Sequence, residues 1–242
     1  MRTIIGFAFV IFGGIVLAPV GLVATIFSLL GLKKPMAAMV YRATQGWARI
    51  MIKLTGCKLT VSGRENIPHD GGLCFIANHT GIFDVVLMLA FSGRAFGFIA
   101  KKELAWVPLI NLWIPCLGGL YLDRKNHRKG LKTIGKGISR IKSGGAMVIF
   151  PEGHRSRGEG LLPFHPGAFK LATQSLAAIV PVAISGSHEL FEKNMRVSPC
   201  PVSISFGKPI YTAEIPLDNR KQVLAEQVYQ AIKEMLEGEG KT

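Results

Sequence analysis

The chain contains few cysteines, few aromatic residues and few acidic residues. None of its four cysteines forms a CxxC pair or flanks a histidine at zinc-finger spacing, which favours buried, reduced thiols over a structural metal site. Aromatic side chains make up only 9% of the 242 residues, and no repeated pattern of basic and aromatic residues is present. We therefore expect no metal ion and no nucleic-acid partner.

Acidic residues are outnumbered by basic ones. The chain has 15 Asp and Glu residues and 29 Lys and Arg residues, which leaves a formal charge of +14 at pH 7. An excess of this size suits a polyanionic partner such as a nucleic acid, an anionic lipid surface or a phosphorylated substrate. Hydrophobic residues make up 49% of the chain and its mean hydropathy is +0.33; a mean this high is unusual for a soluble enzyme and favours contact with a membrane.

A long uncharged run lies near the N-terminus. Residues 3–32 contain no charged side chain, and two lysines follow them. The run is long enough to cross a bilayer, which takes about 20 apolar residues. Pro19 and three nearby glycines interrupt it and favour a kink, so the alternative is two helices of about 14 residues each, too short to cross. We expect either a single membrane helix or a helical hairpin embedded in one leaflet.

Residues 36–54 are predicted to form an amphipathic helix. Apolar side chains recur at helical spacing from Met36 through Trp47 to Leu54, and basic side chains lie near the opposite face. A helix of this kind either lies on an anionic membrane surface or packs its apolar stripe on a protein core.

The remainder of the chain alternates short apolar runs with helical patterns, which is typical of an α/β fold. The expected strands span residues 59–61, 73–77, 96–100, 120–122, 146–150, 179–184 and 202–206. The expected helices span residues 82–91, 129–141, 167–176 and 220–236. We predict a largely parallel mixed sheet flanked by helices.

The sequence NHTGIFD follows the expected strand at residues 73–77. On one continuous helix, His79 and Asp84 would lie about 140° apart and could not meet. If His79 precedes the helix and Gly81 lies in the turn, Asp84 falls in the first helical turn and reaches the imidazole. The carboxylate would then orient the ring and leave Nε2 free to take a proton. The alternative is that Asp84 only caps the helix.

Two further polar segments follow expected strands. In FPEGHRSR, Arg155 suits phosphate recognition, Gly153 frees the backbone, and Glu152 either binds an acceptor hydroxyl or orients Arg155 through a salt bridge. In GGLYLDR, Arg124 closes a strand and is a second candidate for the phosphate, and Lys101 adds positive charge at the end of another strand. In a parallel sheet, these strand ends would converge on one edge.

The apolar stretch from Trp106 to Leu117 lies just before GGLYLDR. It is either an ordinary buried segment or a wall for an acyl chain. A cleft with a base, cations and an apolar surface suits transfer onto an amphiphile that bears a phosphate.

These segments resemble the motifs of the 1-acylglycerol-3-phosphate O-acyltransferases, also called lysophosphatidate acyltransferases. NHTGIFD is similar to the family's NHx4D motif, GGLYLDR to its GxxFIxR motif and FPEGHRSR to its FPEGTRS motif. IVPVAISGS, which contains Val180 and Pro181, resembles the fourth motif. All four occur in the family's order between residues 74 and 187.

The resemblance implies that His79, oriented by Asp84, deprotonates the sn-2 hydroxyl of lysophosphatidate, which then attacks the thioester of acyl-CoA or acyl-carrier protein. It implies no cofactor apart from this acyl donor. The acceptor-binding residues and the apolar supports that it implies are Lys101, Arg124, Glu152, Gly153, Arg155, Val180 and Pro181.

The N-terminal pattern and the motifs together predict a division of the chain into two parts. Residues 1–56 would be a membrane anchor, and residues 57–242 an acyltransferase catalytic domain. We expect the bilayer to be a partner, with the catalytic domain on the cytoplasmic side of a bacterial-type inner membrane.

One departure from the family pattern leaves the acceptor open. His154 stands where the family usually has threonine. A different lysolipid, such as a lyso-ornithine lipid, is therefore an alternative acceptor. A noncatalytic basic protein that recruits anionic lipid would explain the charge and the N-terminus, but it would not explain three motif-bearing strand ends.

Overall fold

The computed structural model describes residue 19, residues 33–108, 110–123 and 125–239. Apart from Pro19, the hairpin or single span expected over residues 3–32 lies outside the described residues, and so does Arg124. Among the helices that are described, none has the length and apolarity needed to cross a membrane.

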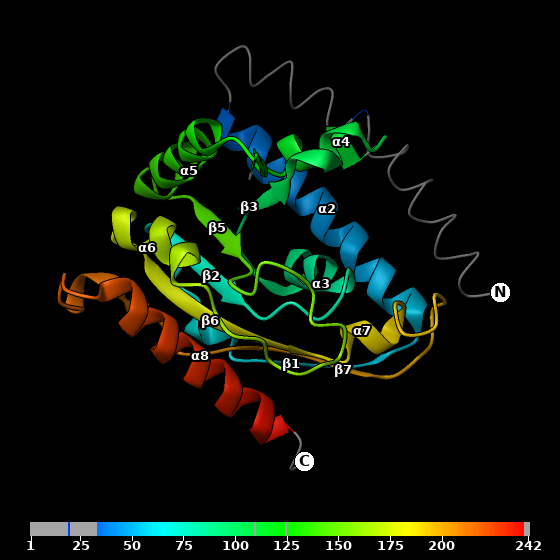
Figure 1. Cartoon of the computed structure of the whole chain (residues 1–242). Coiled ribbons are helices and arrows are strands. Elements are labelled where there is room, and N and C mark those ends of the chain that lie inside the picture. Colours follow the sequence, from blue (N-terminus) through cyan, green and yellow to red (C-terminus); the bar gives the residue numbers. More distant parts are fainter. Residues whose placement is uncertain (1–18, 20–32, 109, 124, 240–242) are drawn as a thin grey trace.

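One mixed sheet forms the centre of the molecule (Figure 1). Its strands follow the order β1–β7–β6–β2–β5–β3–β4, and the short strand β8 also pairs with β6. All neighbouring strands are parallel except β6 with β7 and β6 with β8. The predicted largely parallel mixed sheet is therefore confirmed. The bounds are β1 Lys58–Ser62, β2 Leu73–Ala77, β3 Phe96–Lys101, β4 Leu120–Leu122, β5 Ala146–Ile149, β6 Ala178–Ser185, β7 Pro201–Phe206 and β8 Ile210–Tyr211.

Strand β2 lies in the middle of the sheet, and helices cover both of its faces. All five of its residues are buried, which is the pattern of a parallel strand with helices on both sides. Leu73, Phe75 and Ala77 face one hydrophobic core, and Cys74 and Ile76 face the other. Burial raises the pKa of the Cys74 thiol, as expected of a buried cysteine. The other three cysteines are only half-buried, which corrects the expectation that all four are buried.

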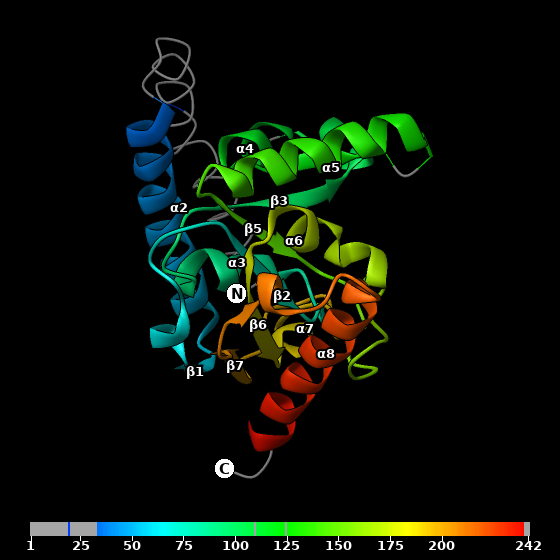
Figure 2. The same cartoon turned by 90° about the vertical axis from the view of Figure 1, so that its left-hand side faces the viewer.

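Two layers of helices cover the sheet, as Figures 1 and 2 show. Helices α2 and α3 pack on the face that holds Phe75, and α5, α6 and α8 pack on the face that holds Ile76. The bounds are α2 Lys33–Thr55, α3 Phe83–Phe91, α5 His127–Lys142, α6 Lys170–Ser175 and α8 Arg220–Glu239.

Helix α2 contains the predicted amphipathic helix. Tyr41, Ala48 and Met51 belong to the same core as the sheet, so part of the predicted anchor shares its core with the rest of the chain. Ile50 and Leu54, on an adjacent side of the helix, are exposed. The helix therefore packs on the protein and still presents an apolar surface outward.

The structure corrects several predicted elements. The helix expected at residues 167–176 is a 3-10 helix, Pro166–Phe169, followed by the short α6. The stretch from Trp106 to Leu117 contains the end of another 3-10 helix and helix α4, Ile110–Cys116, and the Trp106 side chain is 85% exposed. The prediction that this stretch is an ordinary buried segment is therefore wrong at Trp106. The sequence also did not predict β8 or helix α7, Ser187–Leu190. Both elements are too short to show a periodic pattern.

Candidate active site

The side chains of His79 and Asp84 meet at the carboxyl end of β2. His79 lies in the loop after this strand, and Asp84 is the second residue of α3. Their atoms Nδ1 and Oδ2 are 2.7 Å apart. An ionised carboxylate can only accept, so the ring carries its proton on Nδ1 and donates it to Asp84. This leaves Nε2 as the nitrogen that can take a proton from a substrate.

Asp84 is completely buried, and hydrogen bonds rather than a cation surround its carboxylate. Oδ2 also accepts from the backbone N–H groups of Thr80, at 2.7 Å, and Gly81, at 3.0 Å. Oδ1 accepts from the hydroxyl of Ser187, and the hydroxyl of Thr80 lies 3.3 Å from the same oxygen. These donors compensate the desolvation of the charge, so the carboxylate does more than cap the helix.

The loop after β5 holds the backbone and ring of His79. The backbone N–H of His79 donates to Glu152 Oε1 at 3.0 Å, and its carbonyl accepts from the N–H of Ser156 at 2.8 Å. The imidazole stacks on Phe150, with ring centroids 4.1 Å apart. Since β2 and β5 are adjacent and parallel, their ends bring the two motifs together, as the sequence predicts.

Glu152 is buried, with 1% of its surface exposed. Burial raises the pKa of this carboxyl to about 7; the N–H of His79 opposes the shift, and the charge of Asp84 adds to it. The salt bridge from Glu152 to Arg155, one of two expected roles, is wrong: Arg155 pairs with Glu192 instead. In this geometry Glu152 positions His79.

Glu192 joins the arginine loop to the start of α3. Its Oε1 accepts from Arg155 Nη1, and its Oε2 accepts from the backbone N–H of Ile82 at 2.8 Å. Arg155 is about one third exposed, so the guanidinium also reaches solvent. Gly153, with φ of 76°, makes the left-handed turn that leads into this loop, and His154 beside it is exposed.

The other predicted site residues differ in how exposed they are. Lys101 ends β3 on the same sheet edge and is exposed. Val180 and Pro181 are buried within β6, opposite Phe75 and Ile76 of β2, so they lie inside the sheet rather than at its edge.

Three residues that the sequence reading did not single out contribute to the site. Asn78 forms two hydrogen bonds with the backbone of Ile184, which joins the end of β2 to β6. Ser187 and Glu192 reach the site from the segment after β6. The position of Asn78 next to His79 was an available signal, whereas no local spacing relates Ser187 or Glu192 to Asp84.

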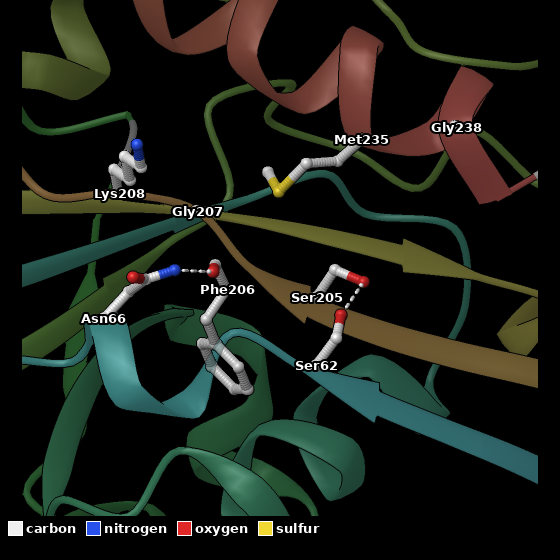
Figure 3. Close-up of a pocket in the computed structure, with 8 residues that line it drawn as sticks. All are labelled: Ser62, Asn66, Ser205, Phe206, Gly207, Lys208, Met235 and Gly238. Atoms are coloured by element: carbon white, nitrogen blue, oxygen red, sulfur yellow. Dashed lines mark hydrogen bonds between the residues drawn. The ribbon is translucent and has the colours of Figure 1, made fainter.

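Two hollows lie near the sheet. One, of about 220 Å³, borders the site and is lined in part by Asn78, Thr80, Ser156 and His188. The other, of about 410 Å³, lies between the outer strands and α8 (Figure 3). Its Ser62 and Ser205 hydroxyls bond to each other, and Asn66 bonds to the Phe206 carbonyl, so these polar groups are occupied within the fold. Within the described residues, no group of three or more His, Cys, Asp or Glu side chains could hold a metal ion.

Comparisons with known proteins show a neighbour with a similar fold and relatives of similar sequence. A solved structure, the 1-acyl-sn-glycerophosphate (LPA) acyltransferase PlsC from Thermotoga maritima, has a similar fold, with a TM-score of 0.75 and 24% identity over 97% of this chain and 98% of that one. Among curated relatives, the 1-acyl-sn-glycerol-3-phosphate acyltransferase of Haemophilus influenzae is 30% identical over 70% of each chain. That of Cocos nucifera is 32% identical over 68% of this chain and 53% of its own length.

The similarity to curated relatives does not extend over their whole length. The matched region spans only between half and two thirds of several of them, including the 1-acyl-sn-glycerol-3-phosphate acyltransferase of Borreliella burgdorferi, at 59%. The model of the Acyltransferase family matches residues 58–185, which is more than half of this chain and includes both the His79–Asp84 pair and the Arg155 loop. The chain therefore belongs to the Acyltransferase family.

Proposed function

We propose that this protein transfers a fatty acyl group from acyl-CoA or acyl-carrier protein to the sn-2 hydroxyl of 1-acylglycerol-3-phosphate, giving phosphatidate. The observation that carries the proposal is the His79–Asp84 contact of 2.7 Å, which directs the basic Nε2 away from the carboxylate. The names of the relatives support the choice of substrate.

The proposed reaction is a direct transfer. His79 Nε2 takes the proton of the acceptor hydroxyl as its oxygen attacks the thioester carbonyl. The tetrahedral intermediate collapses, the C–S bond breaks, and the imidazolium returns the proton to the leaving thiolate. Asp84 stabilises the imidazolium between these steps, and four donors hold its carboxylate in place: the ring Nδ1–H, two backbone N–H groups and the Ser187 hydroxyl. The substrate hydroxyl takes the place of an enzyme nucleophile, so no acyl-enzyme forms.

Acceptor binding is proposed for the cations of the same sheet edge. Arg155 follows β5 and Lys101 ends β3 at this edge, and guanidinium groups match phosphate oxygens in shape and charge. Arg124, which lies outside the described residues, is proposed with them from its place in the GGLYLDR motif. Gly153 would allow the acceptor to approach the backbone closely. Buried Glu152 is better suited to hold His79 than to contact the acceptor.

The proposed site of action is the cytoplasmic face of a bacterial-type inner membrane. Exposed apolar side chains support contact with lipid: Trp106 follows the end of β3, Ile82 is two residues from Asp84, and Ile50 lies on α2. The uncharged residues 3–32 and the charge of +14 favour an anionic bilayer as the partner.

An acyltransferase for a different lysolipid is the second candidate. The exposed His154 stands in the arginine loop where the family motif has threonine, so the acceptor headgroup meets a different side chain. A noncatalytic lipid-recruiting protein would have no need for the buried donors around Asp84.

The test is an assay of purified protein with a panel of lysolipids and both acyl donors. The proposal expects turnover with lysophosphatidate and its loss, by at least about a hundredfold, in His79→Ala. Turnover with a lyso-ornithine lipid alone would select the second candidate. Equal turnover in His79→Ala and the parent would contradict the role of the base, and lipid binding without turnover on any acceptor would contradict catalysis.

A further inference from the structure

The segment from Ser187 to Glu192 lies outside the residues matched by the family model, yet it contacts both halves of the site. We propose that Ser187 and Glu192 are positioning residues, one for the His79–Asp84 pair and one for Arg155. This inference rests on the proposed acyl transfer and assigns the two residues to different steps of it. Ser187 supports the chemical step, and Glu192 supports binding of the phosphate-bearing acceptor.

Ser187 completes the environment of the buried carboxylate. It is 1% exposed, and its hydroxyl donates to Asp84 Oδ1. The Thr80 hydroxyl donates to Ser187 Oγ, 2.6 Å away, and itself lies 3.3 Å from Oδ1. The Nδ1–H of His79 is bound at the other oxygen, Oδ2. The buried Ser187 hydroxyl, held in turn by Thr80, therefore fixes the rotation of the carboxylate that orients the imidazole.

Glu192 connects two parts of the site through its carboxylate. One carboxylate oxygen accepts from Arg155, and the other accepts from the backbone N–H of Ile82, at the turn into α3. The Glu192 side chain is only 14% exposed, compared with 36% for Arg155, so the acid is the fixed member of the pair. An arginine held in this way needs less ordering when a phosphate binds.

The close fit of the segment explains the glycine of NHTGIFD. A Cβ on Gly81 would lie 2.7 Å from Glu192 Oε2 and 3.1 Å from the Cα of His188. The aromatic rings of Phe83 and Phe191 also contact each other, with centroids 6.4 Å apart. The segment is therefore packed directly on the loop that carries the dyad, close enough to transmit small displacements to it.

The first experiment removes one hydroxyl at a time. Ser187→Ala is expected to lower kcat about tenfold and to leave the KM for donor and acceptor unchanged, because a hydrogen bond to a charged group is lost away from the binding surface. Thr80→Val should act in the same direction. In the double variant the losses should combine to less than their product, since the two hydroxyls bond to each other. Ser139→Ala, at an exposed serine of α5 whose hydroxyl donates to the Gly135 carbonyl, is the control.

The second experiment neutralises the acid. Glu192→Gln retains an oxygen for one donor but loses the ion pair, so the KM for the lysophospholipid should rise about fivefold while the KM for the acyl donor and kcat stay within about twofold. Glu237→Gln is the matched control, because Glu237 lies on α8 and pairs at the surface with Lys233 at 3.8 Å.

The outcomes separate the inference from the proposed function. A parent protein without turnover on any lysolipid would refute the function itself. An active parent with unchanged kinetics in Ser187→Ala or Glu192→Gln would overturn the positioning role of that residue alone. A fall in the acceptor KM of Glu192→Gln would also overturn it, because the acid would then act by repelling the phosphate. Equal melting temperatures of variants and parent check that the fold is retained.

Discussion

Glu152 provides a test of the site that does not depend on knowing the substrate. Its pKa is raised to about 7 from an ordinary 4.5, chiefly by burial. The folded protein therefore holds this proton more tightly than the unfolded chain does. Below pH 4.5 both states are protonated; as the pH rises from 4.5 through 7, the unfolded chain loses its proton first and stability falls. At about 1.4 kcal/mol per pKa unit, the loss amounts to about 3 kcal/mol.

The perturbation is Glu152→Gln, which cannot ionise and keeps an oxygen for the His79 N–H. The free energy of unfolding, measured by denaturant titration in detergent at several pH values, should gain about 3 kcal/mol relative to the parent between pH 4.5 and pH 8. Glu159→Gln, an exposed acid in the same loop, should leave the pH dependence of the parent unchanged. Parallel pH curves for Glu152→Gln and the parent would refute the reasoning.

The same residue distinguishes positioning from acceptor binding. Glu152→Ala removes the acceptor of the His79 N–H and should lower kcat about tenfold more than Glu152→Gln does. If Glu152 contacted the acceptor instead, the acceptor KM would rise in both variants and kcat would change little.

Three further substitutions test the rest of the site. Asp84→Asn should lower kcat at least about a hundredfold in the acyl-transfer assay, because the amide favours the wrong tautomer of His79; activity close to that of the parent would contradict this. Gly81→Ala should lower the free energy of unfolding by about 1–3 kcal/mol, measured by denaturant titration, because its Cβ would crowd Glu192 and the backbone of the next segment; an unchanged midpoint would show that the contact relaxes. Arg155→Lys should raise the acceptor KM about fivefold at constant donor KM, because lysine lacks the planar fork of donors; an equal effect on both KM values would contradict selective contact with the acceptor.

The sequence predicted the architecture because its signals are local. The five apolar residues of β2 are followed at once by a polar segment that contains a glycine, and those of β5 by one of the same kind. Apolar runs of this length indicate strands that are buried on both faces, and neighbouring parallel strands end at the same edge. The sequence showed that His79 and Asp84 could meet if the chain turns at Gly81, but it left helix capping by Asp84 as the alternative, and the structure shows the contact.

The sequence did not predict which apolar residues of α2 stay exposed. Its apolar residues form a broad stripe, of which one side packs against α3 and the sheet while Ile50 and Leu54 stay exposed. Periodicity shows that a helix has an apolar face, but it cannot tell which part of that face another element covers.

By itself, the sequence determined that segments with a histidine, an aspartate and an arginine loop follow strands at one edge of an α/β sheet. Only the tertiary structure decided the partners of these groups. Glu152 holds His79 rather than Arg155, Ser187 completes the shell of Asp84, and Glu192 takes the arginine. Ser187 and Glu192 lie more than 100 residues along the chain from Asp84. Local spacing constrains residues within a few turns of each other, whereas contacts between distant segments depend on how the whole sheet packs.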